Sequence, residues 1–113
     1  MKNTPATFIY LSSFDRTAAH LGLTDGDLQV IENELLADPR RGAVIPNTNG
    51  ARKVRIALPG RGKSGGARGI YLYVEAKGRI YLLFLYAKNV QGNLNETEKK
   101  AVRTLIRQLE DEP

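Results

Sequence analysis

The stretch RGIYLYVEAKGRIYLLFLYAK, residues 68–88, contains two runs rich in Ile, Leu, Val, Phe and Tyr. Aromatic and β-branched residues favour strands, so we expect strands over Arg68–Glu75 and Arg79–Lys88. Lys77-Gly78 lies between them and is typical of a hairpin turn. The second run is apolar at consecutive positions, as in Tyr81–Leu85. Such a strand is expected to lie inside a sheet with both of its faces covered.

Upstream, Arg52–Leu58 shows strict alternation, which predicts a strand with one buried face and one basic face. The buried face would carry Val54, Ile56 and Leu58, and the basic face Lys53, Arg55 and Ala57. Thr7–Leu11 predicts an opening strand. Residues 40–51 are rich in turn formers and predict a surface loop, and a second, glycine-rich loop follows over Pro59–Ala67.

Three helices are predicted from apolar spacing and from capping residues. The first begins near Phe14 and stops at Gly22, and the second follows a cap at Thr24 and ends before Pro39. Asn95 is expected to cap the third, whose buried face would carry Ala101, Val102, Leu105, Ile106 and Leu109. The order β-α-α-β-β-β-α predicts a single α+β domain over residues 1–113, with helices packed on a mainly antiparallel sheet.

Composition narrows the chemistry that is available. The chain has 113 residues and no cysteine, so disulfides and thiolate chemistry are excluded. The longest apolar run, Ile80–Ala87, is too short to span a bilayer, and no signal peptide is apparent near the N-terminus. We therefore expect a cytoplasmic protein that has no membrane partner.

Positive charge is concentrated in one segment. Residues 52–88 contain nine Lys or Arg and one acid, Glu75, giving a net charge of +8, whereas the rest of the chain carries −3. This asymmetry is typical of proteins that bind nucleic acids or other polyanions. The alternative is a solvated basic face that only keeps the protein soluble.

The loop GRGKSGG resembles a nucleotide-binding P-loop, but two features argue against one. Ala57 replaces the first glycine, and Ile70–Val74 predicts a strand where the motif requires a helix. The glycines still permit close backbone approach to a phosphate, with Arg61 and Lys63 beside it. A flexible connection between strands is the other interpretation.

The residues argue against metal-dependent nuclease chemistry and still allow RNA cleavage without a metal. His20 is the only histidine and is expected to be a partly buried packing residue, and no cluster of acids accompanies the basic segment. We therefore expect no cofactor and no metal site. RNA carries its own nucleophile, the 2′-hydroxyl, while Arg can stabilise the charged phosphorane and Lys can move a proton. Tyr73 and Tyr86 could stack on bases, although tyrosines in central strands are more often packing residues.

Three motifs in the same order resemble those of one family: IPNTNGARKVR at 45–55, GKSGGARGIY at 62–71 and IYLLFLYAKN at 80–89. The chain is similar to the RelE/HigB toxins of type II toxin–antitoxin systems, and in particular to the HigB-like branch with the GKSGGAR loop. The resemblance implies the RelE-like, microbial-ribonuclease-type fold. It also implies a metal-independent endoribonuclease that cuts mRNA in the ribosomal A site and that a cognate antitoxin inhibits.

By the same resemblance, the catalytic residues would be Lys53, Arg55, Arg68 and Lys88, and Lys63 would contact phosphate. The charge of the basic segment adds Arg52 and Arg61 as expected RNA-binding residues, beside Tyr73 and Tyr86. The expected partners are the ribosome, mRNA and a helix-turn-helix antitoxin, with operator DNA reached only through that antitoxin.

Two departures from the family pattern leave the acid and base roles open. Asn89 stands where better-known members have Arg, and residues 90–98 contain no Tyr. By strand alternation, Arg68 lies on the same face as Ile70 and Leu72, which are expected to be buried. Arg68 must therefore reach the surface either because it lies at the strand's start or through a bulge at Gly69. The rival function is a non-catalytic RNA-binding or regulatory module on the same scaffold.

Overall fold

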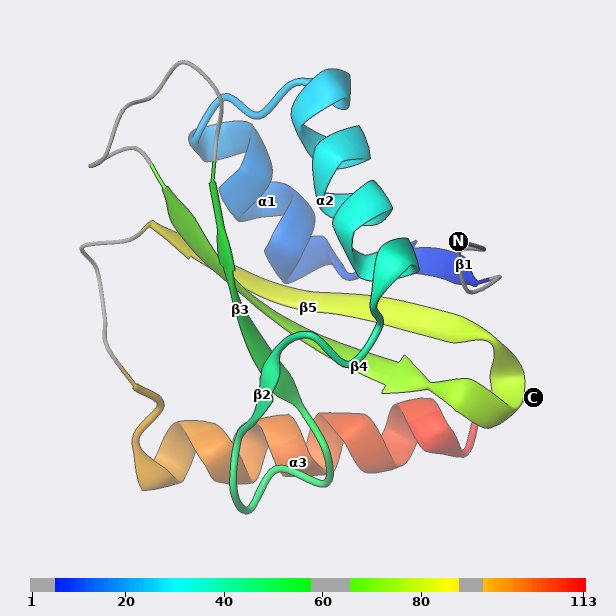
Figure 1. Ribbon diagram of the computed structural model, residues 1–113. Helices are drawn as coiled ribbons and strands as arrows, with labels where there is room; N and C mark the ends of the chain where they lie inside the picture. The colour runs from blue at the N-terminus through cyan, green and yellow to red at the C-terminus, as the bar shows by residue number, and fades with distance from the viewer. Residues whose placement is uncertain (1–5, 58–65, 88–92) are drawn as a thin grey trace.

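A computed structural model of the chain describes residues 6–57, 66–87 and 93–113. A five-stranded sheet with the order β1-β5-β4-β3-β2 forms its centre, and helices cover both of its faces (Figure 1). Neighbouring strands are antiparallel except for β1 and β5, which are parallel. The strands are β1 (Thr7–Tyr10), β2 (Ala43–Val44), β3 (Arg52–Ile56), β4 (Ala67–Val74) and β5 (Arg79–Ala87), and the helices are α1 (Ser12–His20), α2 (Asp25–Ala37) and α3 (Glu96–Glu110).

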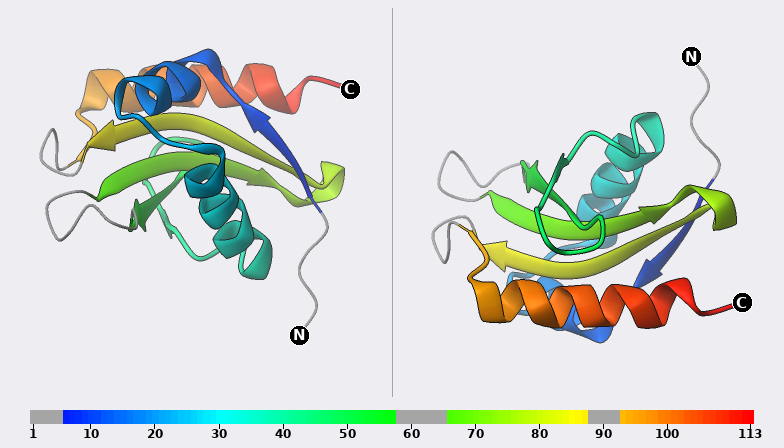
Figure 2. Two further views of the ribbon diagram at one scale, coloured as in Figure 1. Left: turned by 90° about the horizontal axis from the view of Figure 1, so that it is seen from above. Right: turned by 90° about the horizontal axis from the view of Figure 1, so that it is seen from below.

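Two hydrophobic clusters separate the faces of the sheet. Phe14 of α1 and Ile31 of α2 pack in one cluster with inward residues of β3, β4 and β5. Val102 and Ile106 of α3 pack in the other cluster, on the opposite face. The views in Figure 2 show α3 running along β5 rather than beneath β3. We call these the α1/α2 face and the α3 face.

The predicted capping residues begin their helices as expected. The Thr24 side chain accepts from the backbone N–H of Asp27, and the Asn95 side chain accepts from that of Glu98, each within a complete capping box. Capping satisfies N–H groups that the first helical turn leaves without partners. The cap at Asn95 fixes where α3 starts, which matters because the site described below lies beside that start.

A bulge in β5 moves side chains between faces. Ile70 of β4 pairs with Phe84, but the next residue, Tyr71, pairs with Leu82, so Leu83 has no partner of its own in the ladder. Before the bulge, Leu82 packs on the α1/α2 face. After it, Phe84 and Tyr86 lie on the α3 face instead. Without the extra residue, strand alternation would put Tyr86 on the α1/α2 face.

The sheet also has a strand that the sequence pattern did not predict. Residues 40–51 were expected to form a loop, yet Ala43–Val44 pairs with β3 as the edge strand β2. Gly42 permits this pairing because a Cβ there would lie 2.8 Å from the carbonyl oxygen of Lys53. The buried Thr48 then holds the following turn, with its hydroxyl donating to the Ile45 carbonyl at 2.7 Å.

Other details of the sequence prediction need correction. Ala101 is exposed rather than part of the buried face of α3, and His20 is exposed rather than partly buried. The prediction that both faces of β5 are covered is confirmed, because its residues contribute to both hydrophobic clusters. In the described residues, no helix has the length and apolar character to cross a membrane.

Candidate nucleic-acid interface

Strand register assembles a basic row at one end of the α3 face. Arg55 of β3 lies directly opposite Arg68 of β4, and Arg68 lies opposite Tyr86 of β5. Opposed residues in antiparallel strands point to the same face, so Arg55, Arg68 and Tyr86 form one row across three strands. Lys53 lies two positions from Arg55 on the same face and opposite Ile70.

As far as the described residues go, this end of the α3 face is open to solvent, with Arg55 exposed and Lys53 and Arg68 partly exposed. The turn that follows β2 contacts α3, where Arg103 donates to the Asn47 carbonyl at 2.7 Å. Ile70 and Leu72 are buried on that side, whereas Arg68 stands partly exposed near the start of β4. Arg68 therefore reaches the surface through its position at the strand's start. The register shift falls between Ile70 and Tyr71, not at Gly69.

A cleft of about 380 Å³ lies over the row, lined by Lys53, Arg55, Arg68 and Asn93. We call it the basic cleft. The Lys53 ammonium donates to Asn93 Oδ1 at 2.9 Å, which ties β3 to the segment before α3. Among the described residues no carboxylate lines this cleft. Like charges directly opposite in a sheet destabilise it, so the facing pair Arg55 and Arg68 favours an anion between or above them.

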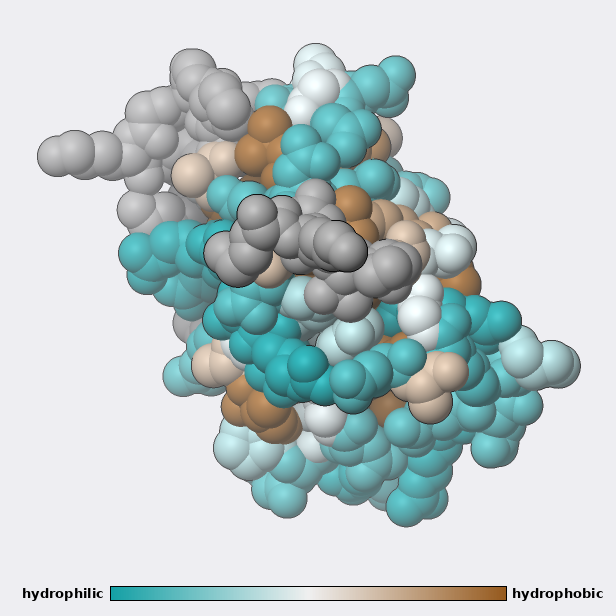
Figure 3. All heavy atoms as spheres, turned by 45° about the vertical axis from the view of Figure 1, so that its right-hand side comes forward, coloured by the Kyte–Doolittle hydropathy of each residue, from teal (hydrophilic) through white to brown (hydrophobic). Residues whose placement is uncertain are grey.

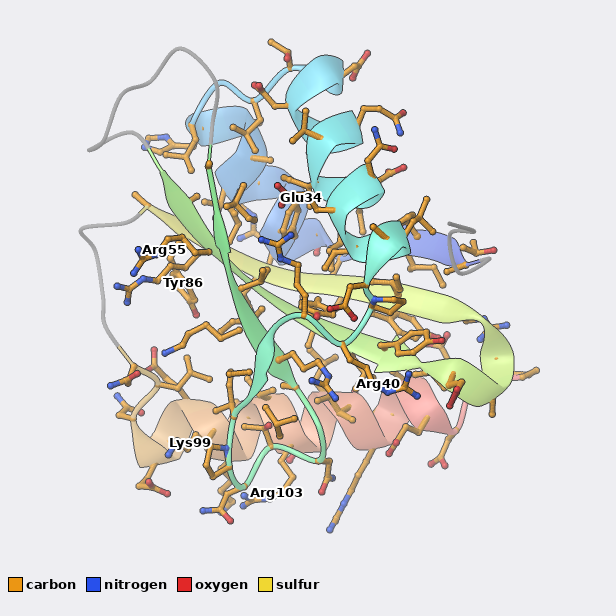
Figure 4. The ribbon with its side chains drawn as sticks, in the orientation of Figure 1. Glu34, Arg40, Arg55, Tyr86, Lys99 and Arg103 are labelled. Atoms are coloured by element: carbon orange, nitrogen blue, oxygen red, sulfur yellow. The ribbon has the colours of Figure 1, made fainter. Side chains whose placement is uncertain are left out.

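The acid of the basic segment lies elsewhere. Glu75 follows β4 at the hairpin and accepts from the Arg40 guanidinium at 2.7 Å. In Figure 4, Arg40 lies away from Arg55 and Tyr86, which lie together at the open end of the sheet. The positive charge of the basic cleft is therefore not offset by Glu75. Both members of the Arg40–Glu75 pair are exposed, so the pair adds little stability.

A second cavity of about 310 Å³ adjoins the basic cleft, and we call it the side cavity. The start of α3 and the strand β2 enclose it, with Lys53, Arg68 and Asn93 shared between the two hollows. Its apolar lining consists of Ala43, Val44, Ile45, Pro46, Ile70 and Leu94, and its remaining polar lining consists of Tyr86 and Lys99.

Tyr86, the third member of the row, lines the side cavity and not the basic cleft. Its ring is nearly parallel to that of Phe84, at an interplanar angle of 17° and with centroids 6.5 Å apart. Burial raises the pKa of Tyr86, and the nearby Glu98 carboxylate raises it further. The phenol therefore keeps its proton at neutral pH and can donate it to a phosphate or a leaving oxygen.

Two of the predicted RNA-binding residues do not join this site. Arg52 donates to the backbone carbonyls of Arg40 and Gly42, at 3.1 and 2.8 Å, and so supports the connection from α2 to β2. Tyr73 packs on the α1/α2 face, where the Arg40 guanidinium carbon lies 5.2 Å from its ring centroid. The geometry gives both residues structural contacts away from the basic cleft.

Three further predicted residues, Arg61, Lys63 and Lys88, lie outside the described residues, as does Asn89. The structure also brings in residues that sequence reasoning missed. Asn93 and Lys99 reach the site from the start of α3, and Val44 from β2. A charge count over residues 52–88 could not include Lys99, because Lys99 is distant from that segment in sequence and approaches it only in the folded protein. Within the described residues, no group of three or more His, Cys, Asp or Glu could hold a metal ion.

Val44 is a large hydrophobic residue whose side chain is exposed. The face in Figure 3 is mostly hydrophilic, and hydrophobic residues appear there only as separate patches. Val44 is 53% exposed, and in the described part of the chain it is the large hydrophobic residue that stands out as exposed. Val44 lines the side cavity together with its neighbours Ala43, Ile45 and Pro46.

Comparisons with known proteins bear on the family and on the fold. Residues 11–112 match a family model described as the RelE toxin of the RelE / RelB toxin–antitoxin system. Among solved structures, the chain is similar to a mutant of the Escherichia coli toxin RelE in the free state. The TM-score is 0.53 and the identity 14%, over 94% of this chain and 98% of that one. At this identity, the structural likeness supports the fold alone.

Proposed function

The chain belongs to the RelE toxin family, and from this premise we propose that it is an endoribonuclease that cleaves mRNA on the ribosome. The observation that carries the proposal is the basic cleft over the facing pair Arg55 and Arg68, which no carboxylate of the described residues lines. Two facing arginines repel each other, and no acid of the described residues lines their cleft. This arrangement therefore favours binding of a phosphodiester rather than stability of the fold. The expected place of action is the cytoplasm, where ribosomes are found.

In the proposed reaction, the 2′-hydroxyl of RNA attacks the adjacent phosphorus. A bond forms between O2′ and phosphorus while the bond from phosphorus to O5′ breaks, leaving a 2′,3′-cyclic phosphate and a 5′-hydroxyl. Arg55 and Arg68 stabilise the additional negative charge of the phosphorane, for which the guanidinium fork is well shaped. Tyr86 is protonated and donates to the leaving O5′. The proton of the 2′-hydroxyl passes to water as O2′ bonds to phosphorus, and Tyr86 regains its proton from solvent after the cut. Lys53, held by Asn93, adds a third cation.

The mechanism needs no metal, because the nucleophile belongs to the substrate and cations of the chain stabilise the charge. Lys88 is proposed as a further cation and Lys63 as a phosphate contact, both from the family resemblance. Membership of the HigB-like branch is likewise a proposal that rests on the GKSGGAR loop.

The proposed partners follow from the family and from charge. The family description names a toxin–antitoxin pair, so we propose an antitoxin that covers the basic cleft with an acidic segment or a helix. We propose further that this antitoxin is a helix-turn-helix protein and that operator DNA is bound only through it. Ribosomal RNA would attract the same positive surface.

One observation favours a second candidate, a non-catalytic RNA-binding module on the same scaffold. Asn89 stands where the better-known family members have Arg, and a missing cation weakens stabilisation of the transition state more than it weakens RNA binding. Such a module would bind the ribosome and leave transcripts intact.

The test is induced expression in a bacterium with mapping of mRNA ends. We expect growth arrest with new 5′ ends inside translated codons, and both should be lost in Arg68→Ala. The matched control is Arg16→Ala, which removes an exposed arginine from α1, on the α1/α2 face. Intact transcripts with a folded wild-type protein would contradict the nuclease and favour the binding module.

A further inference from the structure

We propose that the side cavity holds one nucleobase of the bound RNA and that it favours guanine and uracil over adenine and cytosine. The inference rests on the proposed function and adds a specificity site to it. The site is built by β2 and the start of α3, which lie outside the basic segment that the sequence alone singled out.

Size and position suit one base. The cavity measures about 310 Å³, at the small end of the roughly 300–1,000 Å³ typical of ligand pockets. It shares Lys53, Arg68 and Asn93 with the basic cleft. A phosphate in the cleft and a base in the side cavity can therefore belong to one nucleotide, because the two hollows meet at these three side chains.

The walls suit the flat, apolar faces of a base. Val44 and Pro46 lie on one side, and Ile70 and Leu94 contribute further apolar surface. Tyr86 offers an aromatic ring, on which a base can stack whatever its identity. Val44 is 53% exposed, so a base that covers it would remove apolar surface from water.

The polar groups of the cavity are mainly donors. Lys53, Arg68 and Lys99 carry no acceptor atom in their charged groups, and the oxygen of Asn93 already accepts from Lys53 at 2.9 Å. Guanine O6 and the O4 of uracil are acceptors, whereas the amino groups of adenine and cytosine are donors. A donor-rich lining therefore favours the two bases that carry a carbonyl oxygen at the position where adenine and cytosine carry an amino group.

Lys99 is the residue that we assign to recognise the carbonyl oxygen of the base. Its side chain is only 19% exposed, although it belongs to a lysine near the start of a surface helix. Its partner Glu96, 3.4 Å away, is 83% exposed. An ion pair whose carboxylate is this exposed is weak, so the carbonyl oxygen of a base can compete for the ammonium.

The experiment maps cleavage sites on ribosomes programmed with mRNAs of randomised codons. Wild-type protein should show guanine or uracil enriched about tenfold over adenine or cytosine at one position beside the cut, near the lower end of what one specific base contact contributes. Lys99→Gln should bring the ratio close to one, because an amide offers both a donor and an acceptor. Lys100→Gln is the matched control, since it removes the same charge from an exposed neighbour that does not line the cavity.

Val44→Trp tests the cavity independently of charge. Because Val44 is exposed on an edge strand, the substitution should leave the thermal unfolding midpoint nearly unchanged and reduce kcat/KM about tenfold or more by filling the base site. Ala101→Trp adds the same ring at an exposed position of α3 that does not line the cavity. It should cleave like wild type.

The outcomes separate this inference from the proposed function. Cleavage without base preference, or a preference unchanged in Lys99→Gln, overturns the base site and leaves the nuclease standing. Val44→Trp could instead cleave RNA like wild type but no longer be inhibited by the co-expressed antitoxin. That result would assign the cavity to the antitoxin and would also overturn the base site. If the wild-type protein cleaves nothing, the base site is tested by binding alone, through NMR chemical-shift titration with 3′-GMP, 3′-UMP, 3′-AMP and 3′-CMP. Selective shifts at Val44 and Leu94 with the first two support the base site, and shifts that are absent or equal overturn it.

Discussion

Tyr86 shows how one residue can acquire a chemical role from its neighbours. The bulge in β5 turns it to the α3 face, and burial raises its pKa. A tyrosine that acts as an acid works only while protonated, so its activity is lost as pH rises through its folded pKa. Because that pKa is raised above the ordinary value of about 10, this loss falls outside the neutral range.

Tyr86→Phe should therefore reduce single-turnover cleavage by about 100-fold, with the same ratio to wild type at every pH between about 6 and 9. The flat ratio follows because the phenol stays protonated throughout that window. RNA affinity should change little, since the phenylalanine ring still stacks. A ratio that changes across this range would mean that Tyr86 ionises within it, contrary to its assignment as the proton donor.

At the residue scale, sequence reasoning predicted part of the site. Alternation in β3 placed Lys53 and Arg55 on one face, and the register confirms it. The position of Tyr86 could not be predicted, because a run that is apolar on both faces, Ile80–Tyr86, contains no signal for where alternation breaks. Asn93 and Lys99 depend on how α3 docks, which local sequence does not specify.

At the scale of elements, α3 both stabilises the fold and completes the site. Its buried residues Val102 and Ile106 pack against the sheet, while its start brings Asn93 and Lys99 to the two hollows. The helix and its cap were predictable from apolar spacing and from Asn95. The short strand β2 was not, because two paired residues within a turn-rich segment are too few to produce a period.

Asn95→Ala and Thr24→Ala remove equivalent caps from α3 and α2. Each should lower the free energy of unfolding by about 1 kcal/mol, measured by urea denaturation. Only Asn95→Ala should also slow cleavage, by several-fold, because fraying of α3 displaces side chains of the site and fraying of α2 does not. Equal cleavage rates in the two variants would mean that the start of α3 has no part in the site.

At the scale of the whole molecule, charge and fold act together. The +8 of residues 52–88 suggested polyanion binding, and the sheet gathers Lys53, Arg55 and Arg68 from that segment at one end of the α3 face. It also separates Arg52 and Tyr73 from them. The fold class was predictable from the order of elements, whereas a charge total could not say which basic residues would share a cleft.

Binding to single-stranded RNA should weaken as salt rises, because cations of the protein release counterions from phosphates. Arg55→Gln should reduce the slope of log affinity against log salt by about 0.7, the value for one phosphate contact. Arg16→Gln, on α1, should not change it. Fluorescence anisotropy with a 2′-O-methyl RNA measures binding without cleavage. Equal slopes for both variants would place the RNA away from the basic cleft.

The central claim is that the RNA supplies its own nucleophile while residues of the basic cleft stabilise the phosphorane. The most direct test compares two mRNAs on programmed ribosomes, one all-ribose and one with a single 2′-deoxy nucleotide at the mapped cut. The first should be cleaved to a 2′,3′-cyclic phosphate and a 5′-hydroxyl, and the second should stay intact at that position. Equal cleavage of both at that site would contradict it, because the attacking oxygen would then come from elsewhere.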